Sequence, residues 1–247
     1  MDSRITYFPL PDSLQTQNEA YLDARDREKR LIQDEEVRQL PWVKKGQPHH
    51  HEWRLRAFSL KKLIKFLGTL PPPQRILDLG CGNGWMSHAL ASAGHQVWGM
   101  DINTQEVEQA NRVFDRPNLH WIVGNAFEDL PIGPFDVIVI SAALQYFESP
   151  PAVIQQLSRY LSPEGGVMIM DTSLYLPHQV AAAQQRSRSY YEGLGTATQP
   201  TYHHHTREWL AEFSHRWIYT PSQIAAKLRR FGVPYNPFPM VWVQPGR

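Results

Sequence analysis

The sequence predicts an α/β fold in which helices cover both faces of a mostly parallel sheet. Two observations carry this prediction. Short apolar runs suited to buried strands recur through the middle of the chain, and segments with helical periodicity separate them. Strands that alternate with helices form a parallel sheet, because each helix returns the chain to the edge where the previous strand began. The predicted strands are a run that starts at Arg75, then 95–100, 119–123, 135–140 and 166–170.

The composition is that of an ordinary globular protein. The 247 residues are 42% hydrophobic and 20% charged, with a formal net charge of +1. This balance provides no overall field that would attract nucleic acid or an anionic membrane. The single cysteine, Cys81, excludes an internal disulfide and fits a reducing compartment. The amino terminus lacks a signal-peptide core, and no apolar run has the roughly 20 residues of a membrane span. We therefore expect a cytoplasmic protein without a membrane partner.

The first third of the chain predicts a helical cap. Residues 18–39 are rich in charges of both signs, which is typical of a solvated helix that ends before Pro41. This helix either packs on the domain as an appendage or covers a ligand. A second helix precedes the first strand, with Leu60, Leu63, Ile64 and Leu67 on one apolar face. Its basic side chains, between Arg54 and Lys65, lie mostly on the other faces.

The last third predicts a second cap and a sheet edge. Residues 172–220 are rich in aromatic and histidine side chains, and we expect two helices and a loop there. A helix over 221–232 follows. Three prolines in the tail predict at best an edge strand, since proline cannot donate to a neighbouring strand. We thus expect a single domain, 1–247, with a helical cap over 1–68, a core over 69–171, a substrate-cap insertion over 172–220, and a C-terminal helix and edge strand over 221–247.

A glycine loop follows the first strand in the pattern Asp78-x-Gly80-x-Gly82-x-Gly84. Glycine permits positive φ angles and a close approach of ligand to backbone. In open α/β sheets, ligands bind outside the carboxyl ends of the strands. The other strands end at Asp101, at Asn125-Ala126 and at Ser141. The ligand is therefore expected to span all four strand ends.

The residues beside this loop discriminate between ligand classes. The dinucleotide fingerprint needs a glycine where this chain has Trp85. A carboxylate at Asp78 would repel a pyrophosphate but would suit an ammonium group. These two residues argue against a nicotinamide-dependent oxidoreductase, which we keep as an alternative.

Four segments together resemble the class I S-adenosylmethionine-dependent methyltransferases, and more narrowly their small-molecule branch. They are 75–84, 99–101, 124–131 and 135–138. The resemblance covers about 67–171, with weaker support through 231. It implies a Rossmann-like, doubly wound sheet of seven strands, mostly parallel with the last strand antiparallel. It also implies S-adenosyl-L-methionine as cofactor and a small-molecule methyl acceptor.

The resemblance further implies the cofactor contacts. Asp78 would lie near the amino group of the methionine part, Asp101 at the ribose hydroxyls, and Asn125 at the adenine amine. Asn125 stands where aspartate is commoner, but an amide oxygen also accepts from an amine. The full set of expected cofactor-binding residues is Asp78, Gly80, Cys81, Gly82, Asp101, Ile102, Asn125, Ala126, Phe127 and Ser141.

The chemistry beyond the cofactor is less determined by the sequence. Tyr146, His178 and His203 are candidates for a catalytic base, together with the neighbouring His204 and His205, and spacing selects none of them. A cofactor-binding or interaction protein without turnover is therefore a further alternative. An RNA methyltransferase that uses the basic face over 54–65 is another, although the run Ser141-Ala142-Ala143-Leu144 lacks the N/D-P-P-Y/F pattern of amino-directed nucleic-acid enzymes. The runs 49–51 and 203–205 are histidines, but adjacent side chains diverge, so we expect no metal site.

Overall fold

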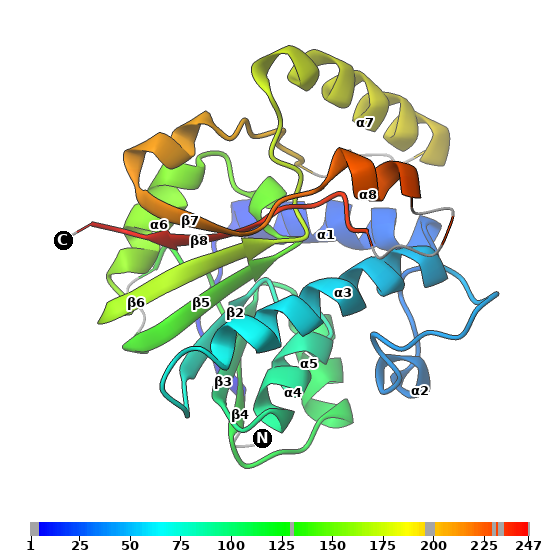
Figure 1. Cartoon of the computed structure of the whole chain (residues 1–247). Coiled ribbons are helices and arrows are strands. Elements are labelled where there is room, and N and C mark those ends of the chain that lie inside the picture. The colour runs from blue at the N-terminus through cyan, green and yellow to red at the C-terminus, as the bar shows by residue number, and fades with distance from the viewer. Residues whose placement is uncertain (1–4, 129–130, 196–200, 229–230, 232–234, 247) are drawn as a thin grey trace.

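The computed structural model describes residues 5–128, 131–195, 201–228, 231 and 235–246. Within these residues, one eight-stranded sheet has the order β1-β4-β3-β2-β5-β6-β8-β7 (Figure 1). The strands are β1 (Ile5–Tyr7), β2 (Arg75–Leu79), β3 (Gln96–Asp101), β4 (Leu119–Val123), β5 (Phe135–Ser141), β6 (Leu161–Met170), β7 (Ser214–Tyr219) and β8 (Met240–Gln244). The α-helices are α1 (Asp12–Arg27), α2 (Asp34–Val37), α3 (His50–Leu67), α4 (Trp85–Ser92), α5 (Thr104–Val113), α6 (Pro150–Ser158), α7 (Val180–Leu194) and α8 (Gln223–Leu228).

The predicted Rossmann-like α/β fold is confirmed. All five predicted strands are present, and the pairs from β1 to β6 are parallel. The last strand, β8, is antiparallel to both of its neighbours. The sheet has eight strands in the described residues, so the expected seven is wrong by one. The additional strand is β1, which pairs with β4 at one edge of the sheet and, at three residues, is too short to show a periodic pattern.

Alternation along the strands divides the core into two layers. Ile76, Val137 and Val139 face the layer built with α3, α4 and α5. The intervening Leu77 and Ile138 pack in the other layer, with α6. These side chains are 0% exposed, because helices cover both faces of the central strands (Figure 1). The rigid centre of the sheet therefore supports the strand ends that were expected to bind a ligand.

The predicted edge strand at the carboxyl terminus is wrong. β8 lies between β6 and β7, and Val241 and Val243 are fully buried. The prolines at 237 and 239 precede the strand, so every residue of β8 keeps its N–H group and can pair on both sides. The edge strand beside β8 is β7, which falls inside the predicted insertion over 172–220. In its described residues, 172–195 and 201–220, that insertion holds one α-helix, α7, two short 3₁₀ turns and β7, instead of two helices and a loop. Of the predicted helix over 221–232, α8 covers Gln223–Leu228, and residues 229–230 and 232 lie outside the described part of the chain.

The amino-terminal cap also differs from the prediction. The single helix expected over 18–39 is two helices, α1 and α2, with a break at Lys29, whose φ is 55°. The second predicted helix is confirmed as α3, where Leu60, Leu63 and Leu67 are buried while Ile64 is 40% exposed. No helix in the described part of the chain is long and apolar enough to cross a membrane.

Candidate functional site

The glycine loop between β2 and α4 has a left-handed backbone at each of its three glycines. The φ angles are 75° at Gly80, 52° at Gly82 and 76° at Gly84. A Cβ at Gly84 would collide with the ring of Trp121, and one at Gly80 would lie 2.5 Å from the Cβ of Ala143. A Cβ at Gly82 would meet nothing nearer than the Glu106 carboxylate, at 3.5 Å. Gly84 therefore accommodates the neighbouring strand, whereas Gly82 presents bare backbone to a cavity.

A cavity of about 890 Å³ lies against this loop at the carboxyl ends of β2, β3, β4 and β5. Its volume is in the range of small-molecule sites in proteins. All ten expected cofactor-binding residues line it: Asp78, Gly80, Cys81, Gly82, Asp101, Ile102, Asn125, Ala126, Phe127 and Ser141. The sheet topology brings these residues together although they are spread over more than sixty positions of the chain.

Asp101 holds the loop in place. Its Oδ2 accepts from the Gly82 N–H at 2.9 Å, and its Oδ1 accepts from the Asn103 N–H at 2.9 Å. Each carboxylate oxygen can accept a second hydrogen bond, so Asp101 can still bind a ligand in the cavity. Asn103 in turn caps α5 by accepting from the N–H groups of Gln105 and Glu106.

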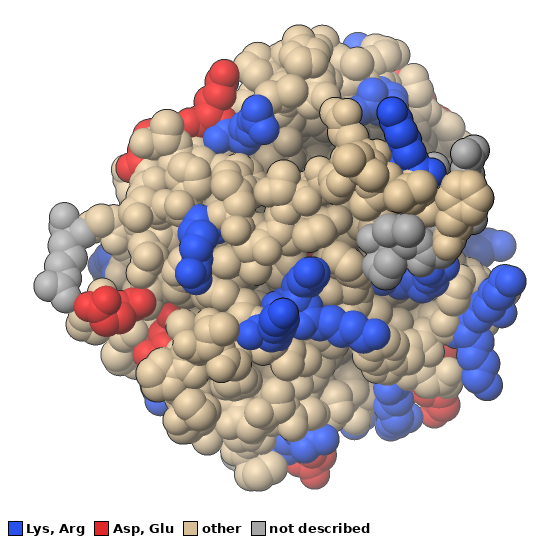
Figure 2. All heavy atoms as spheres, in the orientation of Figure 1, with Lys and Arg blue, Asp and Glu red and all other residues tan. Residues whose placement is uncertain are grey.

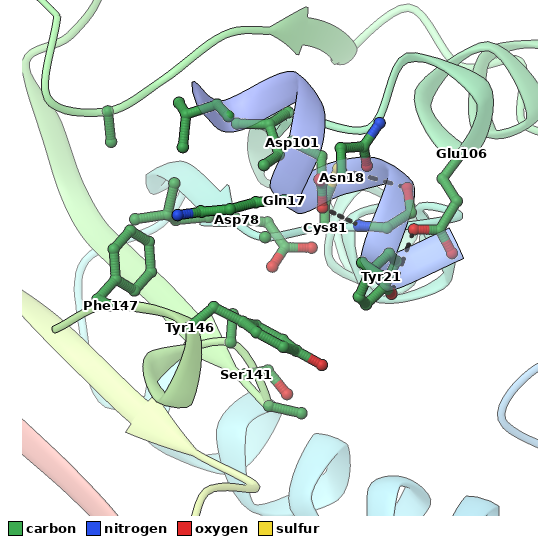
Figure 3. Close-up of a pocket in the computed structure, with 18 of the residues that line it drawn as sticks. Gln17, Asn18, Tyr21, Asp78, Cys81, Asp101, Glu106, Ser141, Tyr146 and Phe147 are labelled. Atoms are coloured by element: carbon green, nitrogen blue, oxygen red, sulfur yellow. Dashed lines mark hydrogen bonds between the residues drawn. The ribbon is translucent and has the colours of Figure 1, made fainter. Parts of the chain in front are cut away.

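Three acidic side chains reach into the same space (Figure 3). Burial, reinforced by the charge of Asp101, raises the pKa of Asp78 to about 6, although the Ser87 hydroxyl donates to Asp78 at 2.6 Å. Removal from bulk water and the charge of Asp101 raise the pKa of Glu106 to about 7. Burial also raises the pKa of Asp101. Carboxylates that lie close together in a cavity repel each other, which disfavours their ionised forms. A cationic ligand would reduce this repulsion.

At the other end of the cavity, Asn125 accepts from the Phe127 N–H at 3.2 Å through its own side chain. The Phe127 N–H group is thus used in a local turn. The rings of Phe127 and Phe147 stand with their centroids 6.0 Å apart, and Ala126 is buried beside them. This end suits a flat apolar group.

The structure separates the candidate catalytic residues. Tyr146 and His203 line the cavity, whereas His178, in a 3₁₀ turn at Pro177–Gln179, does not. Burial raises the pKa of Tyr146, so its phenol stays protonated at neutral pH. His204 pairs with Ser187 at 2.9 Å, and His205 contacts the Leu144 carbonyl at 3.2 Å. A smaller cavity of about 470 Å³ shares Glu148 and His203 with the main one.

Sequence reasoning did not identify the residues that α1 contributes. One face of this helix lines the cavity with Ser13, Leu14, Gln17, Asn18, Tyr21 and Arg25, at helical spacing. Tyr21 donates to Glu106 at 3.4 Å, and its ring meets that of Tyr146 edge to face at 5.7 Å. Figure 3 shows Tyr21 with Gln17 and Asn18 on the side of the cavity formed by α1. A polar and aromatic helix face has no apolar periodicity, which is why the pattern did not reveal it.

The α3 helix contributes Trp53 and Arg56 to the cavity. Arg56 also pairs with Glu52 at 2.8 Å. Because it lines the cavity, Arg56 does not belong to an outer basic face. Lys61 lies over the ring of Trp42, at 5.3 Å. Figure 2 shows Lys and Arg side chains gathered in the middle of the molecular face on which α3 lies in Figure 1.

The two histidine runs serve other contacts. His49 contacts the Glu28 carbonyl at 3.1 Å, and His50 contacts the Val43 carbonyl at 2.9 Å. Among the described residues, no group of three or more His, Cys, Asp or Glu side chains could hold a metal ion.

The fold and the strand-end cavity define an α/β protein built to hold a ligand across the carboxyl edge of its sheet. A family model described as a methyltransferase domain matches residues 50–233. The chain therefore belongs to the methyltransferase domain family.

The chain is also similar to curated methyltransferases and to solved methyltransferase structures. The chain is 29% identical over 107 residues to the ubiquinone biosynthesis O-methyltransferase of Psychrobacter arcticus, covering 40% of each chain. It is 32% identical over 125 residues to the malonyl-[acyl-carrier protein] O-methyltransferase of Halalkalibacterium halodurans, covering 47% of this chain and 46% of the relative. The chain thus spans less than half the length of these relatives. Magnesium protoporphyrin IX methyltransferase from Synechocystis PCC 6803, solved with bound S-adenosylhomocysteine, has a similar fold. That match has a TM-score of 0.59 at 17% identity and covers 95% of this chain and 100% of that one.

Proposed function

We propose that this protein is an S-adenosylmethionine-dependent methyltransferase that acts on a small molecule. The observation that carries the proposal is the meeting of Asp78, Asp101 and Glu106 with the bare backbone of Gly82 in one cavity. Acidic side chains with raised pKa values fit a ligand that brings an ammonium and a sulfonium group. The flat apolar end at Phe127 and Phe147 fits an adenine ring.

The residues of this chain would hold the cofactor in an extended pose along the strand ends. Asp101 would accept from the ribose hydroxyls, and Asp78 would face the amino group of the methionine part. Arg56 is the cation that we assign to the methionine carboxylate, because it lines the cavity and its charge acts on Asp171 beside Ser141. Asp171 accepts from Ser141 at 2.9 Å, and Ser141 borders the expected position of the methyl group.

The cofactor supplies an activated methyl group, and the protein then contributes position and a water-poor cavity. Tyr21 and Tyr146 would enclose the region between the ribose and the acceptor. An oxygen acceptor is supported by the names of the two curated relatives, which are O-methyltransferases. The Synechocystis enzyme, whose fold is similar, was solved with bound S-adenosylhomocysteine, and this supports the choice of cofactor. We also propose a cytoplasmic location, in line with the single buried thiol of Cys81.

Calorimetry with S-adenosylhomocysteine tests the proposal. We expect micromolar binding, about tenfold or more weaker in Asp101→Ala, because the ribose contacts and the loop anchor are both lost. The control Asp26→Ala changes an exposed residue near the end of α1 and should bind normally. No binding below roughly millimolar concentrations, or equal binding by Asp101→Ala, would refute the proposal.

A transfer assay separates the proposal from a binding protein without turnover. The protein is incubated with cell extract and S-adenosylmethionine labelled on its methyl group. Label in the small-molecule fraction is the expected result. Label confined to RNA would favour the basic face of α3, and no transfer to any fraction would favour a non-catalytic role. Trp85, which is buried against Trp53, and Asp78 argue against the nicotinamide alternative.

A further inference from the structure

Three arginines line the main cavity, and they differ in how their charges are balanced. Arg30 lies 2.6 Å from Glu52 and 2.9 Å from Glu28. Arg56 lies 2.8 Å from Glu52. The ion pair of Arg25, with Glu28, is the longest of the three, at 3.7 Å. Glu28 and Glu52 are not among the residues that line the cavity.

The carboxylate nearest to Arg25 already has other partners. Glu28 accepts from Arg30 through one oxygen and from the Tyr190 hydroxyl, at 2.7 Å, through the other. A guanidinium offers five N–H donors in a planar fork. The 3.7 Å ion pair with Glu28 and the hydrogen bond with the Tyr21 hydroxyl leave donors of Arg25 for a ligand. The Arg25 side chain is 25% exposed, and it belongs to the cavity wall. A cation withdrawn from bulk water in this way favours an anionic partner.

The surroundings of Arg25 suit a carbon skeleton next to that anion. Its guanidinium lies over the ring of Tyr21, 4.9 Å from the centroid. Tyr146 meets the same ring edge to face. Leu14 and Ile32 also line this cavity. The charged group of a ligand could therefore reach Arg25 while its apolar part packs on aromatic and aliphatic side chains.

Resting on the proposed function, we infer that the methyl acceptor is a carboxylic acid whose carboxylate binds Arg25, with its carbon skeleton against Tyr21 and Tyr146. Guanidinium and carboxylate match in a bidentate pair, which gives orientation as well as affinity. Arg25 then determines acceptor specificity, while Arg56 serves the cofactor. The Arg25 guanidinium lies over the Tyr21 ring, whereas Arg56 acts on Asp171 beside Ser141. The charge of Arg25 also acts on Asp101 and Glu106, so the test below includes the affinity for the cofactor.

The test compares simple acids with their neutral amides on protein saturated with S-adenosylhomocysteine. Benzoate against benzamide and hexanoate against hexanamide are suitable pairs, followed by ligand-observed NMR titration. We expect the acids to bind about tenfold or more tightly than the amides, since each amide keeps the shape and loses the charge. Arg25→Gln should abolish this preference, and Arg25→Lys should keep part of it because the charge remains. The affinity for S-adenosylhomocysteine should stay within about threefold in both variants, a change below 1 kcal/mol.

Arg27→Gln is the matched control. Arg27 lies on the same helix but pairs with Asp23 at 3.0 Å outside the cavity, so this variant should keep the preference for acids. Equal binding of acids and amides, or failure of every acid to bind in the millimolar range, would overturn the inference.

A second probe detects the alternative in which Arg25 holds the cofactor itself. Arg25→Gln would then lose affinity for S-adenosylhomocysteine but not for 5′-methylthioadenosine, which lacks the amino-acid part, and the inference would be wrong. Unchanged protein that fails to bind S-adenosylhomocysteine would instead refute the proposed function, and this inference with it. Thermal denaturation of each variant establishes that it is folded.

Discussion

At the level of single residues, the glycine loop meets two different demands. Gly82 opens the backbone to the cavity, whereas Gly84 makes room for the Trp121 ring of β4. We predict that Gly84→Ala destabilises the protein by ~2–4 kcal/mol, because the new methyl group adds overpacking to a strained φ angle. Urea denaturation measures the change in the free energy of unfolding.

Gly94→Ala provides the control for backbone strain alone. Gly94 has a φ of 95°, but a Cβ there would have nothing within 4 Å. Its substitution should cost only about 1–2 kcal/mol, the usual penalty for a side chain in the left-handed region. Equal losses in the two variants would mean that contact with Trp121 does not determine the residue at 84.

The acidic cluster predicts that cofactor binding depends on pH. With pKa values raised to about 6 at Asp78 and about 7 at Glu106, both groups lose their charge as the pH falls through this range. A neutral acid no longer attracts the ammonium group of the ligand. We therefore expect the affinity for S-adenosylhomocysteine to rise between about pH 5 and about pH 8 and then to level off. Calorimetry across this range measures it, and Glu106→Gln should flatten the upper part of the curve.

The same groups have the opposite effect on the stability of the protein without ligand. A carboxyl group whose pKa is higher in the folded than in the unfolded state binds more protons when folded. Stability should then decrease as the pH rises from the unfolded value, 4.5 for Glu106, to about 7. Glu106→Gln should gain stability relative to the unchanged protein over this interval. A constant difference between the two proteins from pH 4 to pH 8 would contradict the assignment.

At the level of elements, ion pairs join the turn after α1 to α3. Arg30 bridges Glu28 and Glu52, and Glu52 also pairs with Arg56. Burial alone would raise the pKa of Glu52, but the two arginines lower it to about 2. The stabilisation is therefore present above the unfolded value of 4.5 and is lost as the pH falls toward 2.

We predict that Glu52→Gln lowers the free energy of unfolding by ~1–3 kcal/mol at pH 7, because two cations lose their shared partner in a partly buried site. Denaturation at pH 7 and near pH 3 measures this effect, which should shrink at the lower pH. Glu35→Gln is the control: Glu35 is 79% exposed and lies 3.5 Å from Arg38, so its loss should change little. A loss at Glu52 that is independent of pH would indicate packing instead of charge.

The sequence predicted the regular elements of the core and misassigned those held by distant contacts. Strands β2 to β6 are apolar runs, and their own side chains are enough to predict that they are buried. The end of α1 at Arg27 depends instead on long-range contacts, such as that of His49 with the Glu28 carbonyl. The position of β8 inside the sheet depends on β7, a strand with mostly exposed side chains that no alternation marks.

At the level of the whole molecule, some residues of the candidate site could be predicted from the sequence and others could not. Asp101, Asn125 and Ser141 could be predicted to meet because parallel strands share one carboxyl edge. Tyr21 and Arg25 could not, since their place over the cavity depends on how α1 packs, and Tyr21 lies 85 residues from its partner Glu106 in the sequence. The strand ends of the core and the helices of the cap therefore line one cavity together.

The division between core and cap predicts where ligand binding slows hydrogen exchange. Central strands such as β2 and β5 are buried over most of their length and should exchange only through global unfolding. The α1 helix buries only Ala20 and Ala24, yet one of its faces lines the cavity. The α7 helix, all of whose residues are described, contributes no side chain to that cavity.

We therefore predict that S-adenosylhomocysteine slows amide exchange in peptides from α1 by about tenfold or more, and in peptides from α7 much less, because only α1 rests on the ligand. Mass spectrometry with and without ligand measures both helices in one experiment. The two helices also touch, since Tyr190 of α7 donates to Glu28 and Arg27 donates to the Leu194 carbonyl. Removing the Tyr190 hydroxyl with Tyr190→Phe should leave the protection of α1 in place, if that protection comes from the cavity. Protection that appears equally in α7, or that disappears in this variant, would show that the two helices respond as one unit and that α1 alone does not close the site.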